Sequence, residues 1–290
     1  MSHEDADGTS ADRGRPDGID VAVIGGGNMG TALVQGMLRA DDARTGAIAV
    51  VEAAADRRVE LVELFGDRVE VLDRVPPARS AVIAVKPQHV ASAAAAAGTA
   101  GVGRVLSVAA GVSTASIAAA TGPGVAVVRT MPNTPALVGE GVVAVCAGST
   151  ATDDDLAWAE SLLDPVGLVV RVDESQIDAV TGLTGSGPAY VFLLAEALIA
   201  AGSDVGLPPE QVGPMVAQLL VGSARMVAEY GDPADLRAKV TSPGGTTAEG
   251  IAVLEARDLR GAVAAAVAAA TRRSAELGAP AEADGSGPPG

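Results

Sequence analysis

The feature that most constrains the fold is a glycine-rich turn between a strand and a helix near the start of the chain. The apolar, β-branched run at 19–24 (IDVAVI) predicts a buried strand. It leads into GGGNMG, which satisfies G-x-G-x-x-G and precedes a helix-like stretch. In this setting the first glycine allows a tight turn, the second admits a pyrophosphate against the backbone, and the third lets helix and strand pack closely. The turn predicts a dinucleotide site that includes Gly25, Gly27, Asn28, Met29 and Gly30.

Strand-like and helix-like segments alternate through the first half of the chain. Further apolar runs occur at 48–51, 80–85, 105–108 and 125–128. Helix-compatible stretches such as 55–65 and 90–97 lie between them. Alternation of this kind predicts a parallel sheet that is covered by helices on both faces. We therefore expect an α/β N-terminal domain with a Rossmann-type doubly wound sheet.

Residues just beyond these runs are candidates for cofactor contacts, because ligands bind outside the carboxyl ends of strands in such a sheet. The candidates are Ala84, Val85, Lys86, Pro87, Val108, Ala109 and Ala110. Lys86 is either a ligand for the ribose or a carboxylate, or an ordinary surface lysine, and His89 is expected at the surface.

Glu52 follows the second run and bears on the choice of cofactor. A carboxylate at this place usually accepts hydrogen bonds from the ribose hydroxyls and repels a 2′-phosphate. Arg57 and Arg58 lie close behind and could instead attract that phosphate, or they could form a solvated helix surface. The sequence therefore predicts NADPH or NADH, with Glu52 favouring NADH.

After about residue 172 the pattern becomes helical. Helical stretches are expected at 188–203, 209–229, 247–254 and 259–277. Pro208, Pro209 and Pro233 mark helix starts, and Gly206 and Gly231 mark helix ends. The first of them is apolar on most sides and must be covered by neighbours, so a helical dimer interface is expected. The predicted division of the chain is a disordered tail at 1–18, an NAD(P)-binding domain at 19–172, an all-α dimerisation and substrate domain at 173–278, and a disordered tail at 279–290.

Composition excludes several classes of function. Acidic residues number 36 against 20 basic ones, which gives a net charge of -16. Nucleic acid requires a basic surface, so we expect neither nucleic acid nor an anionic membrane as a partner. With two histidines and one cysteine, Cys146, which is expected to be a buried thiol, neither a metal site nor a histidine-based triad is predicted. No uncharged apolar run reaches 18 residues and no secretory signal is evident, so a cytoplasmic protein is expected.

Two glycine-containing loops in the helical half could bind a small carboxylate. One lies at 184–190 (TGSGPAY) and the other at 241–249 (TSPGGTTAE), and both run into helices. Helix N-termini offer unpaired N–H donors, although ordinary capping is the alternative. The stretch 182–190 contains no lysine or histidine to act as the base in alcohol oxidation. Reduction of a C=N bond mainly requires the electrophilic carbon to be held against a nicotinamide, and a hydroxyl such as that of Thr247 would orient the nitrogen.

At these motifs the chain resembles the pyrroline-5-carboxylate reductases. The stretch at 233–255 (PADLRAKVTSPGGTTAEGIAVLE) is similar to the C-terminal signature of that family. VIGGGNMG, AVKP, MPNTP and DAVTGLTGSGPAY agree with it in order and spacing, over residues 19–277. The resemblance implies NAD(P)H-dependent reduction of L-1-pyrroline-5-carboxylate to L-proline, the last step of proline biosynthesis. It also implies a homodimer, or a larger assembly of dimers, joined through the helical domains.

The resemblance further implies roles for individual residues. The backbone of the loop at 242–247 would bind the substrate carboxylate, and Thr247 would be the catalytic residue that hydrogen-bonds the ring nitrogen. Glu174 would lie near the substrate, with Glu174 and Thr247 contributed by different subunits. The implied substrate-binding residues are Glu174, Ser242, Gly244, Gly245, Thr246 and Thr247.

The chain departs from the family pattern at two places. Many members carry Asn, Ser or Arg after the second strand, where this chain has Glu52-Ala53-Ala54, and Lys239 replaces an asparagine found in some members. Other functions also remain open. A β-hydroxyacid dehydrogenase or a related imine reductase would share the domain layout, although the missing helix lysine counts against the former. An NAD(P)-sensing regulatory protein would bind the cofactor without turnover.

Overall fold

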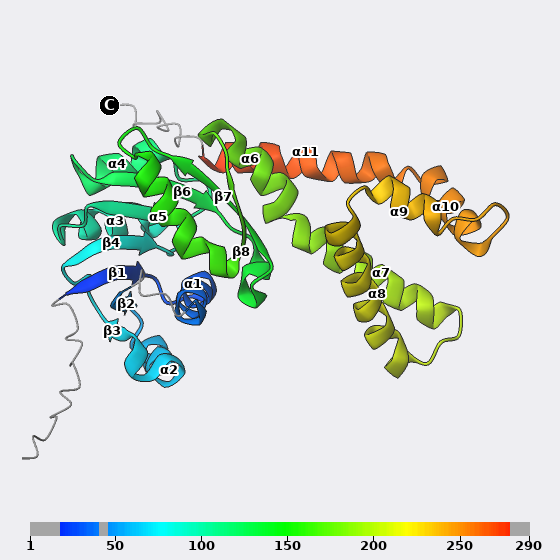
Figure 1. The fold of residues 1–290 in the computed structure, drawn as a ribbon, viewed down its shortest axis with the longest axis horizontal. Coiled ribbons are helices and arrows are strands. Elements are labelled where there is room, and N and C mark those ends of the chain that lie inside the picture. Colours follow the sequence, from blue (N-terminus) through cyan, green and yellow to red (C-terminus); the bar gives the residue numbers. More distant parts are fainter. Residues whose placement is uncertain (1–17, 41–45, 279–290) are drawn as a thin grey trace, which may run out of the picture. The chain divides into compact units, whose positions relative to one another are not determined.

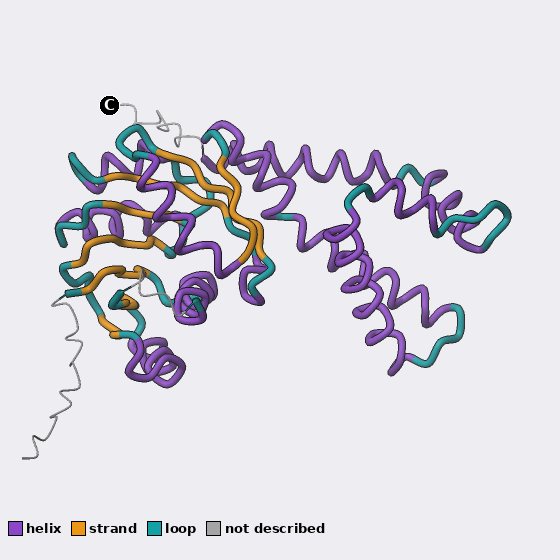
Figure 2. Tube along the Cα trace, viewed as in Figure 1, coloured by secondary structure: helices purple, strands orange, loops and turns teal. Residues whose placement is uncertain are grey.

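The computed structural model describes residues 18–40 and 46–278, so the predicted tails, apart from Gly18, lie outside the described residues. The chain forms two compact units. One contains the residues up to Thr130 together with Val145–Val166, and the other contains Met131–Ala144 and the chain from Gly167 onward. The secondary structure of each unit can be followed in Figure 1 and Figure 2. The boundary predicted at residue 172 marks where the sequence pattern becomes helical, whereas these two units are defined by their internal contacts. The predicted boundary therefore stays a prediction.

The sheet has eight strands in the order β3-β2-β1-β4-β5-β6-β7-β8. Its strands are β1 (Ile19–Ile24), β2 (Ile48–Val51), β3 (Glu70–Leu72), β4 (Ala78–Ile83), β5 (Arg104–Ser107), β6 (Ala126–Met131), β7 (Gly141–Ala147) and β8 (Gly167–Arg171). The pairs from β3 through β6 are parallel, with Val23 opposite both Val50 and Val82. The chain winds outward in one direction from β1 to β3 and in the other from β4 onward. This reversal between β1 and β4 is where a doubly wound sheet binds its ligand.

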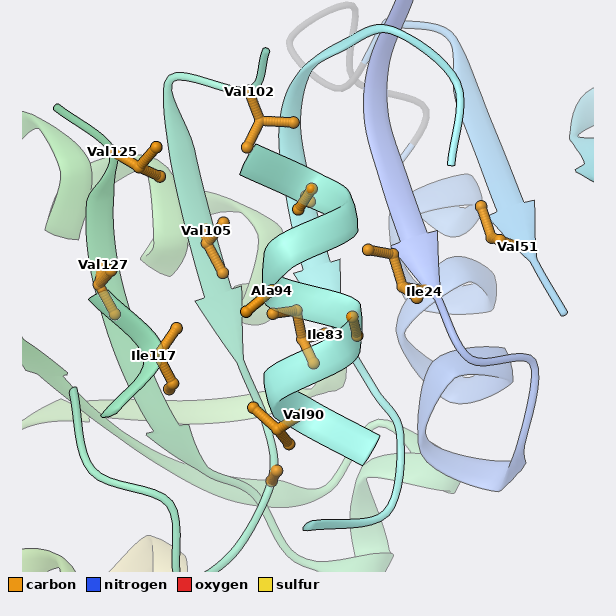
Figure 3. Close-up of a cluster of buried hydrophobic side chains, with 14 residues drawn as sticks. Ile24, Val51, Ile83, Val90, Ala94, Val102, Val105, Ile117, Val125 and Val127 are labelled. Carbon is orange, nitrogen blue, oxygen red and sulfur yellow. The ribbon is translucent and has the colours of Figure 1, made fainter. Parts of the chain in front are cut away.

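Helices of the first unit pack on the strands of that unit. They are α1 (Asn28–Arg39), α2 (Ala55–Phe65), α3 (Val90–Thr99), α4 (Thr114–Thr121) and α5 (Asp153–Leu163). Because aromatic residues make up only 2% of the chain, the core consists of aliphatic side chains. Figure 3 shows one cluster of them, in which Val90 and Ala94 of α3 lie over Ile83 and Val105 of the strands. The small alanines of α3 let this helix pack close to the sheet.

The second unit is mainly helical. After β8 come η5 (Glu174–Gln176), α6 (Ile177–Val180), the π-helical segment η6 (Thr181–Gly185), α7 (Gly187–Asp204), α8 (Pro209–Tyr230), α9 (Pro233–Lys239), α10 (Thr246–Ala256) and α11 (Leu259–Gly278). The π-helical segment packs on α11, and a Cβ at Gly182 would lie 2.2 Å from the Thr271 hydroxyl. The Ser274 hydroxyl donates to the Asp178 carboxylate at 2.6 Å, which fixes α6 to the carboxyl-terminal half of α11.

The helix α7 differs from an ordinary core helix, because none of its residues is buried. By length and composition alone, the continuous helical stretch Glu174–Asp204 could cross a membrane, and none of its most apolar window is buried within the chain. The same criterion is met by core helices of soluble proteins, so it is weak evidence for a membrane. The apolar side chains of α7 are left exposed by the rest of the chain.

The structure confirms the predicted fold class and most of the predicted elements. The first two strands and α2 have the predicted bounds, and the long helices begin and end within three residues of the predicted positions. Cys146 is buried and His89 is exposed, as expected. Three strands, β3, β7 and β8, were not predicted, and neither were the helices α4, α5, α6 and α9.

Candidate active site

The structure brings the predicted cofactor segments of the first unit to one edge of the sheet. The hydrogen bonding of the strands continues for one residue beyond their ends: Gly25 N–H donates to Val51 O at 2.8 Å, and Ala84 N–H donates to Ile24 O at 2.8 Å. Val108 N–H likewise donates to Ile83 O at 3.0 Å. The four segments that begin at Gly25, Glu52, Ala84 and Val108 therefore lie side by side, although they are far apart in the sequence.

The glycine turn has the shape that a pyrophosphate requires. Gly25 has a φ of +109°, and a Cβ there would lie 2.5 Å from Ala84 O. A Cβ at Gly30 would lie 2.0 Å from Gly25 O, so α1 can approach the turn only with glycine at this position. Gly27 is different: a Cβ there would meet nothing within 4 Å, and this residue caps α1 without a side-chain hydrogen bond. Open space in front of unpaired helix N–H groups fits a bound phosphate.

The neighbouring segments differ in exposure. Ala109 is buried, Ala84, Val85 and Val108 are half-buried, and Lys86 is exposed where it precedes the short helix that starts at Pro87. Such small, partly buried residues leave backbone accessible beside the turn. The Lys86 side chain forms no hydrogen bond or ion pair within the described residues, so its contact with the cofactor stays a prediction.

The loop before α10 in the second unit has the geometry of an anion-binding turn. Gly244 has a φ of +70°, and Gly245 N–H donates to Ser242 O at 3.0 Å. A Cβ at Gly245 would lie 2.6 Å from the Ser242 hydroxyl, so the turn closes tightly only with glycine. Gly245 caps α10 without a side-chain hydrogen bond, and Thr247 is exposed on the first turn of that helix. The N–H groups of this first turn are available to a carboxylate.

The loop that contains GSGP is held by residues whose role was not predicted from the sequence. Asn133 Nδ2 donates to Thr184 O at 3.0 Å, and Val142 N–H donates to Asn133 Oδ1 at 2.8 Å. The Tyr190 hydroxyl donates to Gly182 O at 3.1 Å, across the π-helical segment. π-Helical turns inside helices are frequent at functional sites. Asn133 lies in the MPNTP motif, so the motif pointed to this residue without showing what it binds.

One chain does not bring Glu174 and Thr247 together. Glu174 begins η5, directly before α6, and α6 is fixed near Ser274 on α11. Thr247 lies on α10, which precedes the first residue of α11, Leu259. Figure 1 shows α6 and α10 at opposite ends of α11. At ~1.5 Å per helical residue, the part of α11 between them spans roughly 20 Å, which is too far for one small substrate to bridge.

Ionisable groups cluster where α9, α10 and α11 meet. Arg260 Nε donates to both oxygens of Glu255, at 3.0 and 3.1 Å, and Arg237 Nη1 lies 3.4 Å from one of them. The hydrogen bonds from Arg260 lower the pKa of Glu255, and the same contact raises the pKa of Arg260. This cluster ties together the helices on either side of the Ser242 loop. Among residues 18–40 and 46–278, no group of three or more His, Cys, Asp or Glu side chains could hold a metal ion.

Together, the Rossmann-type sheet with its open glycine turn and the helical unit with its Ser242 loop are typical of a nicotinamide-dependent oxidoreductase. Residues 20–111 match a family model described as NADP oxidoreductase coenzyme F420-dependent. Residues 174–277 match the model of pyrroline-5-carboxylate reductase dimerisation. The chain belongs to the pyrroline-5-carboxylate reductase family, since it aligns along almost its whole length with curated members.

The relatives include bacterial proteins of nearly the same length. A pyrroline-5-carboxylate reductase from Mycobacterium leprae is 41% identical over 283 residues, which cover 89% of this chain and 96% of the relative. One from Synechocystis is also 41% identical and covers 90% of this chain and 98% of the relative. The alternative functions considered from the sequence are not favoured by these relatives.

Solved structures of the family have the same fold. A pyrroline-5-carboxylate reductase from Coxiella burnetii matches with a TM-score of 0.82 and 35% identity, covering 90% of this chain and 99% of that one. A pyrroline carboxylate reductase from Plasmodium falciparum with NADP bound matches with a TM-score of 0.77 and 28% identity, over 90% of this chain and 98% of that one.

Proposed function

We propose that this protein reduces L-1-pyrroline-5-carboxylate to L-proline with NADH or NADPH, the last step of proline biosynthesis. The observation that carries the proposal is the tight Ser242 loop, which opens α10 and places Thr247 on its first turn. This arrangement suits a small carboxylate with a nitrogen nearby. It occurs in a chain 41% identical to curated reductases of this substrate.

In the first unit, the residues at the carboxyl edge of the sheet hold the cofactor. The open space at Gly27 would receive the pyrophosphate, and the N–H groups of Asn28, Met29 and Gly30 at the start of α1 would donate to it. The segments 84–87 and 108–110 line the adjacent edge. The bound nicotinamide, when reduced, supplies the hydride.

In the second unit, the loop at 242–247 orients the substrate. Backbone N–H groups hold the carboxylate, and the Thr247 hydroxyl hydrogen-bonds the ring nitrogen. Hydride adds to the imine carbon, and the proton on nitrogen comes from water or is already present in the iminium form. No side-chain acid is required, because an iminium carbon is electrophilic by itself. The loop contributes mainly position, which is a large part of the catalysis of such a step.

We further propose that two subunits share each active site. The separation of Glu174 from Thr247 along α11 supports this arrangement, since one substrate can contact both side chains only if they come from different chains. The uncovered apolar side chains of α7 and α8 supply a surface for a homodimer, and the match to a dimerisation model supports this. The helical domain at 173–278 would then be the dimerising domain, and 19–172 the cofactor domain. We place the enzyme in the cytoplasm, with neither nucleic acid nor a membrane as a partner.

The direct test is oxidation of NADH and NADPH by the purified protein with the cyclic imine as substrate. Thr247→Ala should lower kcat/KM by about 10–100-fold, the scale of one directed hydrogen bond in the transition state. Thr99→Ala, the same change at an exposed position on α3, should leave kcat/KM unchanged. No turnover by the wild type would reject the proposed reaction, and full activity of Thr247→Ala would remove the role assigned to its hydroxyl.

The cofactor turn can be tested separately. Gly27→Ala should fold normally, because the added methyl group meets no protein atom within 4 Å and the φ of -71° suits alanine. It should weaken dinucleotide binding by about 10-fold or more, since the methyl group occupies the space assigned to the pyrophosphate. Calorimetric titration with NAD⁺ and NADP⁺ measures this loss. Unchanged binding of both would place the pyrophosphate elsewhere.

A further inference from the structure

Glu52 is fixed against the glycine turn by two backbone donors. Gly26 N–H donates to Oε2 at 3.0 Å, and Ala54 N–H donates to Oε1 at 2.9 Å. Since each carboxylate oxygen can accept two hydrogen bonds, one acceptor position remains on each oxygen. A ribose offers two hydroxyl donors. The carboxylate is therefore held beside the glycine turn, and its two free acceptor positions match the two hydroxyl groups of an unmodified ribose.

The space around this carboxylate is tight. A Cβ at Gly26 would lie 2.4 Å from Leu61 Cδ1 and 3.3 Å from Glu52 Oε2. The Gly26 peptide is thus enclosed between α2 and the end of β2. Because both its N–H and its carbonyl are engaged, we expect this peptide to keep Glu52 in place when the turn binds a ligand.

The nearby arginines are engaged by the protein itself. Arg57 Nε donates to Gly26 O at 2.8 Å, its Nη2 donates to the Thr31 hydroxyl at 3.0 Å, and its Nη1 pairs with Glu60. All three nitrogens of this guanidinium therefore have partners. Arg57 acts as a strap between α2 and the glycine turn.

Arg58 is turned toward the backbone behind the carboxylate. Its Nη1 donates to Glu52 O at 2.9 Å and to Ala53 O at 2.8 Å. Among residues 52–60, three carboxylates (Glu52, Asp56 and Glu60) outnumber two guanidiniums, so this segment carries a net negative charge. An added phosphate dianion would meet net repulsion here.

We infer that this reductase selects NADH over NADPH, with Glu52 as the selecting residue and Arg57 as a positioning residue for the turn. The inference rests on the proposed function for its reaction but concerns only the adenosine end of the cofactor. The 2′-phosphate both removes one hydroxyl donor for Glu52 and brings like charge to its carboxylate. NAD⁺ should bind about 10-fold or more tightly than NADP⁺. Added salt should reduce the difference between the two Kd values, because it screens the repulsion between the 2′-phosphate and the Glu52 carboxylate.

The test is calorimetric titration of the wild type and of Glu52→Gln and Glu52→Ser with NAD⁺ and NADP⁺, without the imine. Both variants remove the charge, and they differ in what they leave for the Gly26 N–H. Because the two cofactors differ only at the 2′ position, general damage to the turn cancels in the ratio of their Kd values. Each variant should lower the ratio of Kd for NADP⁺ to Kd for NAD⁺ by about 10-fold. Glu63→Gln, at an exposed position on α2, should leave the ratio unchanged.

Arg57→Gln distinguishes a strap from a phosphate ligand. If Arg57 holds the turn, the variant should weaken both cofactors by the same factor. Arg68→Gln, which lies before β3 at the opposite end of the strands, is the matched control and should change neither Kd. The inference is overturned if the wild type binds NADP⁺ more tightly, if the Glu52 variants keep the wild-type ratio, or if Arg57→Gln weakens NADP⁺ alone. None of these results depends on turnover, so a failure of the proposed reaction would be seen separately in the assay with the imine.

Discussion

The two units of this protein bury apolar side chains to very different extents. Most residues of β1, β2, β4 and β5 are buried, including Val21, Ala22, Val23 and Ile24 in β1. Of the described residues from 187 to 278, only Val212, Val216 and Ser274 are buried. On α7, Phe192 is 59% exposed and Leu193 is 65% exposed. A large exposed apolar surface usually marks an interaction site, so the first unit completes its core within one chain, whereas the second exposes the surface proposed to meet another chain.

The largest effect should come from placing a charge on the uncovered face of the helical unit. Leu193→Asp should raise the dissociation constant of the dimer by about 100-fold or more, because an unpaired charge buried in an interface costs about 3–5 kcal/mol. Activity should fall with it, since the proposed active site requires two chains. Sedimentation velocity over a range of concentrations measures the dissociation.

The matched control is an exposed leucine in the first unit. Leu64 on α2 is 44% exposed, and Leu64→Asp should leave the dimer intact. If Leu193→Asp remained dimeric while Leu64→Asp dissociated, the contrast between the two units would be reversed.

A core substitution in the first unit should destabilise the protein without changing its assembly. Ile83 on β4 is fully buried among Val90, Val105 and other members of the cluster in Figure 3. Ile83→Ala should lower the free energy of unfolding by about 2–5 kcal/mol, through lost burial and the cavity left behind. Urea denaturation followed by circular dichroism measures this loss. The loss should be independent of protein concentration, whereas the stability of the helical unit should rise with concentration.

The smallest effect should come from the exposed ion cluster of the helical unit. The lowered pKa of Glu255 means that its pairing with Arg260 stabilises the fold fully above the unfolded-state pKa of about 4.5 and is lost as the pH falls through the lower, folded-state pKa. Glu255→Gln should therefore reduce the Tm slightly at neutral pH and have no effect in stronger acid. Glu229→Gln on α8 is the control. A difference in Tm that grew on acidification would contradict this account.

The parts of the fold that could be predicted are those whose limits are marked by a clear sequence pattern. β1 and β2 are apolar runs bounded by glycine or charge, and α7 and α8 have proline in their first two residues and are followed by glycine, so their limits are visible in the sequence. β3 has only three residues at the edge of the sheet and begins with Glu70, so it has little apolar pattern. β7 contains a clear apolar run around Cys146, from which the burial of this thiol was predicted but not a strand.

The candidate site was predictable where it consists of local motifs, but not where it depends on contacts between segments that are distant in the sequence. The glycine turn, Glu52 and the Ser242 loop are local motifs, and the structure gives each of them the geometry that the motif implies. The partners of Glu52 could not be predicted, because Gly26 lies 26 residues earlier in the chain and meets it only through strand pairing. The π-helical segment and its contact with Asn133 depend on packing between distant segments in the same way.

The distance that α11 places between Glu174 and Thr247 has a genetic consequence. If paired chains share each site, a chain damaged at one of these positions and a chain damaged at the other would form a mixed dimer with one doubly damaged site and one intact site. Two inactive alleles could then restore proline prototrophy when expressed together, although neither does so alone.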